Sequence, residues 1–242
     1  MRRLVLFALL ISLTAIAVDA QRSRTKTPAR QKAKPAQIPS VVPVDKNAPA
    51  HGSDDIYGTV SGRTYTNTAL GFVLEFPDTW LIPGRDFEEH MRSQGFDLSL
   101  KAPEGVSRTN KIQIERALER VKVLVTAYRS MPGSEDNAIL RISLEDLSLV
   151  PAVKDAVDYF DLMRSQFAVM QLPADFKYSE TQAEKLGEKQ FAFLDTSATS
   201  GKKRMYATVK NGVAVMFTLS YTKAEDLETM RKILAAGDFN LK

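Results

Sequence analysis

The chain of 242 residues has 33 lysines and arginines against 29 acidic residues, a formal net charge of +4 and no cysteine. The lack of cysteine excludes disulfides, thiol catalysis, thiolate zinc sites and a lipoprotein signal, which acylates a cysteine. The excess of positive charge lies at the start of the chain. Residues 1–20 have a net charge of +1 and residues 21–50 of +6, which leaves a net charge of −3 for residues 51–242. A basic face on a folded domain is therefore not indicated, and we expect no nucleic acid partner.

Residues 1–20 have the pattern of a secretory signal peptide. Arg2 and Arg3 precede an apolar run, and Val18-Asp19-Ala20 follows as a cleavage site with small or aliphatic side chains. The apolar run covers 15 residues, fewer than the roughly 20 that a membrane-spanning helix needs. We expect cleavage near Ala20 and export to the periplasm or the medium, with no transmembrane segment in the mature chain. A permanent anchor is the alternative.

Residues 21–56 are expected to form a disordered linker. The stretch up to residue 50 is rich in proline, alanine and basic residues and has no aromatic residue, so it cannot bury enough apolar surface to fold. Two interpretations of the linker remain open. One is a solubilising spacer. The other is weak contact with an anionic surface, to which each lysine or arginine contributes about 1 kcal/mol.

Residues 57–242 are long enough for one domain with a substantial core. The segments 63–67 and 71–76 predict two short strands around a turn, because Phe72, Leu74 and Phe76 alternate onto one face. The elements expected next are a helix that carries Phe87, His90 and Met91 and stops at Gly95, a helix that runs into a strand between Ile114 and Val125, and a strand over residues 139–147.

A long helix and a meander of strands are expected after that. The helix opens at Pro151, and Asp155, Asp158 and Asp161 form an acidic stripe that we interpret as its solvated face. The dipeptide Asn211-Gly212 suits a two-residue type I′ turn, because both residues tolerate positive φ. The strands of the meander are expected over residues 176–185, 189–197, 203–210 and 213–221.

A final amphipathic helix closes the domain. Thr222 and Glu225 have the spacing of a capping box, and Gly237 occupies a position that is commonly left-handed at the end of a helix. The residues expected to face inward are Leu227, Met230, Ile233 and Leu234. Hairpin strands combined with a few long helices predict an α+β fold with a mostly antiparallel sheet.

No pattern in the sequence predicts a catalytic residue, a cofactor or a metal. The two histidines, His51 and His90, lie in no cluster with metal-ligand spacing. The segment from Thr199 to Lys203 fails as a phosphate loop, because it lacks the first glycine and has Lys203 where serine or threonine is required, so we interpret it as a hairpin turn.

Trp80 and His90 are the candidates for lining a ligand or partner groove. Trp80 is the only tryptophan, and packing at the edge of the core is the favoured alternative for it. His90 shares a helical face with Phe87 and Met91, which favours a partly buried structural histidine.

The run Tyr65-x-Asn67, Gly71-Phe72-x-Leu74-x-Phe76-Pro77-x-x-Trp80 resembles the opening of PsbP-like domains. The C-terminal strands, the Asn-Gly hairpin and the last helix are similar to the closing part of that family. The resemblance implies an α/β/α sandwich around an antiparallel sheet, and a family of adaptor or assembly proteins without catalytic residues. Fold analogy alone does not carry a function across.

Two functional hypotheses follow. The first is an exported, non-catalytic binding or assembly module of the cell envelope, whose partner is an envelope protein or polymer. The second is a small-ligand-binding protein or a hydrolase with a site assembled from distant polar residues, which requires polar groups that converge in the folded chain.

Overall fold

The computed structural model describes residues 55–84, 87–95, 98, 100, 107–132, 134, 136–170, 172–199 and 201–240. The expected signal peptide, His51 and the expected linker up to residue 54 lie outside these residues. The described chain opens with a short 3-10 helix, η2 (Asp55–Tyr57), two residues before the expected start of the domain. Within the described residues, no helix is long and apolar enough to cross a membrane.

A small antiparallel sheet follows, with β1 (Thr59–Ser61), β2 (Thr64–Asn67) and β3 (Phe72–Glu75) in that order. The expected hairpin is therefore confirmed as β2 and β3. β1 is an additional edge strand, which the sequence did not predict because all three of its residues are exposed and show no hydrophobic alternation. Buried Asn67 ties the hairpin to η2, since its amide donates to the Ile56 carbonyl at 2.8 Å and accepts from the Leu70 amide at 2.9 Å.

The large sheet is antiparallel and has seven strands. Its strands are β4 (Val121–Tyr128), β5 (Ile139–Asp146), β6 (Lys177–Tyr178), β7 (Gln182–Leu186), β8 (Lys189–Ala198), β9 (Gly201–Lys210) and β10 (Val213–Tyr221). The order is β4-β5-β10-β9-β8-β6, and β7 also pairs with β8. The last strand thus inserts into the middle of the sheet, between β5 and β9.

Two features of the meander were tested by the structure. The turn at Asn211 and Gly212 is confirmed, because both residues have positive φ, 53° and 76°. The single strand expected over residues 176–185 is wrong, because the segment divides into β6 and β7, which pair with different parts of β8. Ser179 separates them, and its hydroxyl accepts from the Asp195 amide at 3.1 Å.

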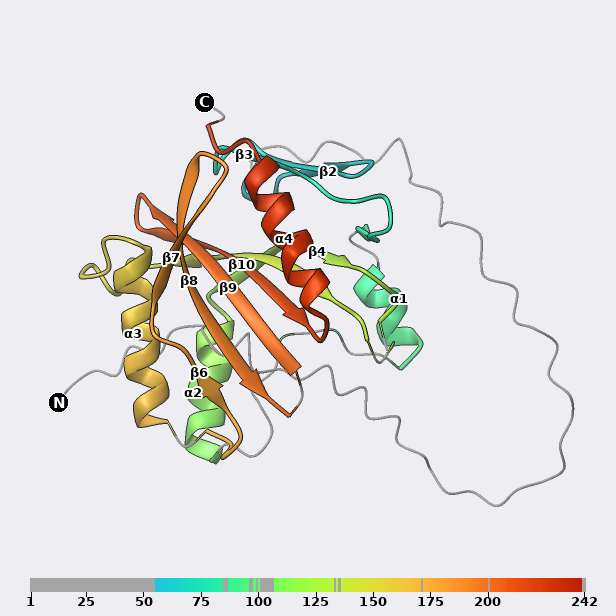
Figure 1. Ribbon diagram of the computed structural model, residues 1–242. Helices are drawn as coiled ribbons and strands as arrows, with labels where there is room; N and C mark the ends of the chain where they lie inside the picture. Colours follow the sequence, from blue (N-terminus) through green and yellow to red (C-terminus); the bar gives the residue numbers. More distant parts are fainter. Residues whose placement is uncertain are drawn as a thin grey trace, which may run out of the picture.

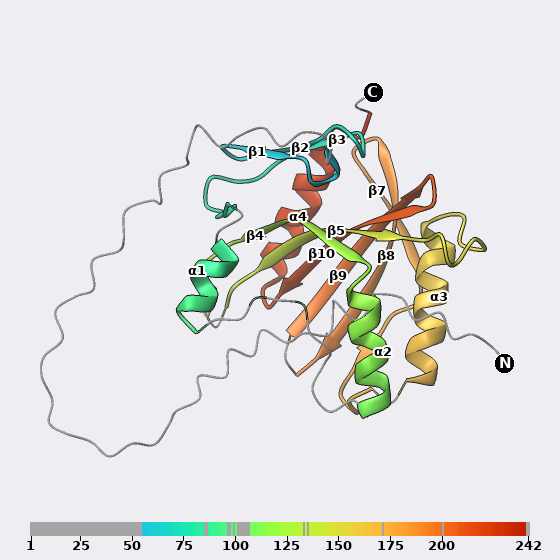
Figure 2. The same cartoon turned by 180° about the vertical axis from the view of Figure 1, so that it is seen from behind.

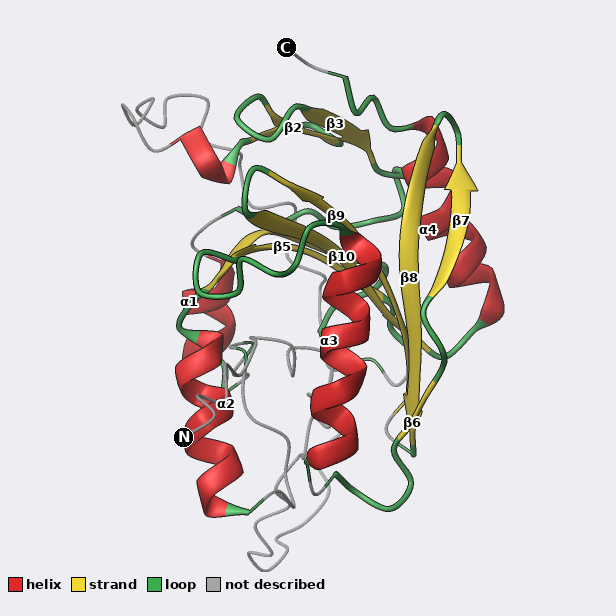
Figure 3. Cartoon of the chain, turned by 90° about the vertical axis from the view of Figure 1, so that its left-hand side faces the viewer, coloured by secondary structure: helices red, strands yellow, loops and turns green. Residues whose placement is uncertain are grey.

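Four α-helices complete the described domain: α1 (Phe87–Ser93), α2 (Arg108–Leu118), α3 (Ala156–Val169) and α4 (Ala224–Ala236). Figures 1 and 2 show α4 and the small sheet over one face of the large sheet, and Figure 3 shows α2 and α3 on the opposite face. The fold is therefore α+β, with helical layers on both faces of a mostly antiparallel sheet, as expected.

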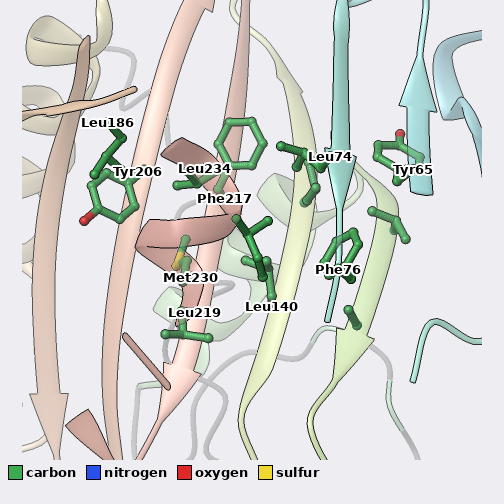
Figure 4. Close-up of a cluster of buried hydrophobic side chains, with 14 of the residues drawn as sticks. Tyr65, Leu74, Phe76, Leu140, Leu186, Tyr206, Phe217, Leu219, Met230 and Leu234 are labelled. Atoms are coloured by element: carbon green, nitrogen blue, oxygen red, sulfur yellow. The ribbon is translucent and has the colours of Figure 1, made fainter. Parts of the chain in front are cut away.

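Each face of the large sheet has its own apolar core. The core on the α4 face contains Leu74, Phe217 and Leu234, all with no exposed surface, and Figure 4 shows them packed against the sheet with Tyr65, Tyr206 and Met230. The core on the other face joins α2 and α3 to strands β8, β9 and β10. We name these faces the α4 face and the α2/α3 face.

The long helix begins later than expected. Pro151 lies in a turn, and α3 starts at Ala156, because the Asp155 carboxylate caps it by accepting from the backbone amides of Val157 and Asp158 at 2.8 and 2.9 Å. An aspartate that satisfies free amides is a strong helix start. Asp155 therefore ends the turn rather than belonging to a stripe along the helix.

Two expectations for α4 are wrong. The N-cap is Lys223, which makes no side-chain cap bond, so Thr222 and Glu225 do not form a capping box. Gly237 is extended, with φ −66° and ψ 140°, rather than left-handed. A Cβ added to Gly237 would lie 2.6 Å from Cδ2 of Leu74, so close packing against β3, not positive φ, explains glycine there.

Candidate functional site

The α2/α3 face of the large sheet changes from apolar to polar along the strands. Met205 of β9 and Leu194 of β8 are fully buried in the core of this face. Two residues further along the same strands, on the same face, are Lys203 and Thr196. We name the polar end of this face the cationic patch, and its members are Thr126, Arg141, Thr196, Lys203, Thr218 and Ser220.

Strand register places the patch residues opposite one another in two rows. In the first row, Arg141 of β5 pairs with Thr126 of β4 on one side and with Thr218 of β10 on the other. In the second row, Lys203 of β9 pairs with Ser220 of β10 and Thr196 of β8. Directly opposed residues of antiparallel strands project to the same side, so the two cations share one surface.

The first row contains two buried hydroxyls. Thr126 and Thr218 are 8% and 4% exposed. Within the part of the chain that the structure describes, neither Oγ1 atom has a hydrogen-bond partner. A buried polar atom without a partner costs about 1–3 kcal/mol, so these hydroxyls destabilise the fold as it stands.

The pKa of Lys203, one of the two cations of the patch, is lowered. Burial, and secondly the positive charge of Arg141, lower the pKa of Lys203 from 10.5 to about 7. Both side chains are half-buried, so each keeps some contact with solvent. Near neutral pH the charged and neutral forms of the Lys203 amine are therefore both populated.

The same face of the sheet also carries a buried acid, further along β5. Glu145 lies four residues along β5 from Arg141, and its Oε2 accepts from the Tyr159 hydroxyl of α3 at 2.8 Å. Burial and the Glu145 carboxylate raise the pKa of Tyr159 well above its usual value. Tyr159 is therefore a permanent donor in this contact.

The α4 face holds a second polar group, made of ion pairs. Arg204 of β9 donates to both carboxylate oxygens of Asp195, at 2.7 and 2.5 Å, and its guanidinium stacks 4.2 Å from the centre of the Phe193 ring. The Tyr206 hydroxyl donates to Glu184 at 2.5 Å, and Glu184 also pairs with Arg231 of α4. These bonds join strands β7, β8 and β9 to α4.

A third polar group lies where β4 ends and α4 begins. Arg129 forms an ion pair with Asp226, with 2.7 Å between Nε and Oδ1, and lies 3.8 Å from Asp136, which also pairs with Lys223. Burial raises the pKa of Asp226, whereas the ion pair with Lys223 lowers the pKa of Asp136. The side chain of Lys223 pairs with Asp136 and makes no capping hydrogen bond to α4.

The two residues expected to line a groove differ in burial. Trp80 is 6% exposed and belongs to the core of the α4 face. His90 is exposed, so the expected partial burial is wrong; Phe87 and Met91, four residues apart, form the contact side of the short α1. A groove that contains both Trp80 and His90 stays a prediction.

Sequence reasoning placed Lys203 at the end of a hairpin turn and at the start of the strand over residues 203–210; the strand is confirmed, but β9 starts two residues earlier, at Gly201, so Lys203 lies within it. The alternation of inward-facing and outward-facing residues along the strand could have revealed the position of Lys203. Lys203 continues the inward series Met205, Ala207 and Val209, and Arg141 lies in the same way on β5. A cation at an inward position of a strand is unusual and marks a candidate site.

Among the described residues, no group of three or more histidine, aspartate or glutamate side chains is placed to hold a metal ion.

No protein-family model and no curated protein matches the chain. Among solved structures, a crystal structure from Bacteroides thetaiotaomicron VPI-5482 is 11% identical with a TM-score of 0.36, and the match covers 74% of this chain and 48% of that one. The solution structure of cyanobacterial PsbP from Synechocystis sp. PCC 6803 is 15% identical with a TM-score of 0.37, and the match covers 78% of this chain and 96% of that one. These similarities concern the fold alone.

Proposed function

We propose that this protein is an exported, non-catalytic binding or assembly module of the cell envelope. The observation that carries the proposal is that the buried and half-buried carboxylates of the domain are engaged in hydrogen bonds or ion pairs. Four carboxylates of the described chain are buried or half-buried. Glu145, Glu184 and Asp195 accept hydrogen bonds from a tyrosine or an arginine, and Asp226 forms an ion pair with Arg129. Acids engaged in this way stabilise a scaffold, whereas a general acid or base must be poised to exchange its proton.

The sequence supports the location in this proposal. A signal-like start and a basic, proline-rich segment precede the domain. A linker of this composition lets a domain range roughly 30 Å from its attachment point, at about 5–6 Å times the square root of its length. The domain can then meet a protein or polymer of the envelope while the linker touches an anionic surface.

Crosslinking in cells tests the proposal. The tagged full chain is crosslinked, purified from envelopes and analysed by mass spectrometry beside a chain that lacks residues 21–50. We expect a reproducible protein or polymer partner with both chains, because the domain makes the contact. Recovery of the monomer alone would refute the binding module, and a partner lost with the deletion would assign the contact to the linker.

A second candidate, a small-ligand-binding protein, is favoured by the cationic patch, where polar groups from five strands meet on one face. Its hydrolase form needs in addition a nucleophile or an activated water. Incubation with ester and phosphoester substrates separates the two forms, since a binding protein leaves them intact.

A further inference from the structure

Strands β6 and β7 form a free edge of the large sheet. Both pair with β8 on one side, and within the described residues no strand pairs with them on the other side. Figure 3 shows the two strands along the outer side of β8. An open edge offers unpaired backbone groups to any other strand, so natural proteins protect such edges.

The pairing of this edge with β8 contains one extra residue. Tyr178 of β6 pairs with Thr196. Gln182 of β7 pairs with Phe193. The edge therefore advances by four residues, 182 − 178, while β8 advances by three, 196 − 193. One extra residue on one strand of an antiparallel pair is a β-bulge, and we name residues 179–181 the edge bulge.

The edge bulge lets the edge use both faces of the sheet. Tyr178 lies on the α2/α3 face, where its ring centre is 5.3 Å from that of Phe167. Glu184 lies on the α4 face, where it accepts from Tyr206 and pairs with Arg231. Residues six apart in a regular strand project to the same side, so a strand without the extra residue could not make both contacts.

Bonds with Asp195 of β8 fix the start of the edge bulge. The backbone amide of Ser179 donates to the Asp195 carbonyl at 2.9 Å. The Ser179 hydroxyl accepts from the Asp195 amide at 3.1 Å. A side-chain oxygen, rather than a backbone carbonyl, thus accepts the bond from β8 at the point where the regular ladder is interrupted.

Helix α3 holds the rest of the edge bulge. The Thr181 hydroxyl donates to Oδ1 of Asp161 at 2.6 Å. Arg164 pairs with Glu180, and its Nη1 lies 3.4 Å from the same oxygen of Asp161. Because α3 is packed on the sheet through its own apolar side chains, these contacts attach the edge bulge to a fixed element.

We propose that the edge bulge, held by α3, prevents this edge from pairing with the same edge of a second copy of the chain. A bulge bends and twists its strand, so it interrupts the straight row of backbone groups that a second edge needs. Two identical edges match each other under two-fold symmetry, which makes a second copy the partner that is always present. The inference concerns the oligomeric state and does not depend on an envelope partner.

The local sequence of the edge shows why protection is needed. Residues 176–185 have the pattern of a single strand, and it is the contacts with β8 and α3 that divide them. Without the extra residue, β6 and β7 would form one continuous strand from Lys177 to Leu186. A long, regular edge strand of this kind is a template for association.

Deletion of Glu180 tests the role of the edge bulge. It removes the extra residue and leaves Tyr178 and Glu184 five residues apart, so they still project to opposite faces. The edge then becomes regular while the contacts on both faces are kept. The matched control is Glu180→Gln, which removes the charge that pairs with Arg164 but keeps the extra residue.

Sedimentation equilibrium of the full chain measures self-association, and hydrogen exchange at high protein concentration locates it. We expect wild type and Glu180→Gln to be monomers. The deletion variant should self-associate at least about tenfold more tightly than wild type, with slower exchange of the amides of residues 177–186. Adding Ala183→Lys to the deletion variant should restore the monomer, because Ala183 is exposed on the edge and lysine there opposes pairing.

Four results would overturn the proposal: a folded deletion variant that stays monomeric, equal self-association of Glu180→Gln and the deletion variant, association that persists with Ala183→Lys, or a wild-type dimer joined through residues 177–186. If the deletion variant does not fold, the double variant Thr181→Val/Arg164→Met takes its place, because it removes the bonds to α3 without shortening the chain. It should also associate more tightly than wild type, and a monomer would again contradict the proposal. The presence or absence of an envelope partner does not affect these measurements.

Discussion

Replacement of Lys203 by methionine should stabilise the protein at acidic and neutral pH. Lys203 is a half-buried cation beside Arg141, and methionine has a similar length without the charge. The protein as described bears the cost of the desolvated amine, and the variant does not. The gain in stability therefore measures how strongly the fold disfavours this charge.

The size of the effect follows from the pKa. Lowering the pKa from 10.5 to about 7 corresponds to about 5 kcal/mol, since a tenfold change in proton affinity is worth about 1.4 kcal/mol. Because solvent still reaches part of the side chain, we expect about half of that, roughly 2 kcal/mol. The expected gain for Lys203→Met is thus ~2 kcal/mol in the free energy of unfolding near pH 6.

The pH dependence has a definite sign. Below pH 7, Lys203 is charged in both the folded and the unfolded chain, so the full cost is present. Between pH 7 and 10.5 the unfolded chain keeps a proton that the folded chain has lost, so the stability of the wild type rises with pH. The advantage of the methionine variant should shrink across this window.

Urea denaturation from pH 6 to pH 9.5 measures these differences, with the fluorescence of the buried Trp80 as the signal. Lys202→Met, which alters an exposed lysine of the same strand, serves as the control and should change the free energy of unfolding by no more than about 0.5 kcal/mol. Parallel stability curves for wild type and Lys203→Met would refute the reasoning. A less stable variant at pH 6 would show that the amine stabilises the fold through an ion pair.

Two further predictions use matched pairs of positions. Gly187→Ala and Gly62→Ala both place a side chain at positive φ, but only at position 187 would the new Cβ meet another element, 2.3 Å from the carbonyl oxygen of Ala235 in α4. Thermal unfolding should show that the free energy of unfolding falls by about 1 kcal/mol for Gly62→Ala and by about 3 kcal/mol or more for Gly187→Ala. Equal losses would contradict the close approach of Gly187 to α4. Asp155→Ala should cost about 1 kcal/mol by removing the cap of α3, whereas Thr222→Ala should be nearly neutral, and urea denaturation of both variants checks this. A larger loss at Thr222 would restore the capping box.

Much of the fold could be predicted because its signals are local. The Asn211-Gly212 turn needs two residues that accept positive φ, and the strands on either side alternate in hydrophobicity. The inward positions of α4 repeat at threes and fours, and Met230, Ile233 and Leu234 are indeed buried. Patterns of this kind depend only on the residues that form the element.

The errors arose where distant residues compete for the same segment. Thr222 and Glu225 match a capping pattern, but Lys223 is held by an ion pair with Asp136, which lies far away in the sequence. Gly237 has the spacing of a left-handed cap, but its role is to make room for Leu74 of β3. A local sequence pattern cannot show where Asp136 or Leu74 lies in the folded chain, because both are distant in sequence from α4.

The sequence by itself determined the class of the fold, the order of its elements and which side of most strands and helices is apolar, because these properties follow from residue periodicity. The grouping of the residues of the cationic patch, in contrast, depends on the tertiary structure. Arg141 and Lys203 come together because β10, the last strand, enters the sheet between β5 and β9. Strand order results from the packing of the whole chain, which balances long-range contacts against the entropy of closing long loops, and that balance has no local signature.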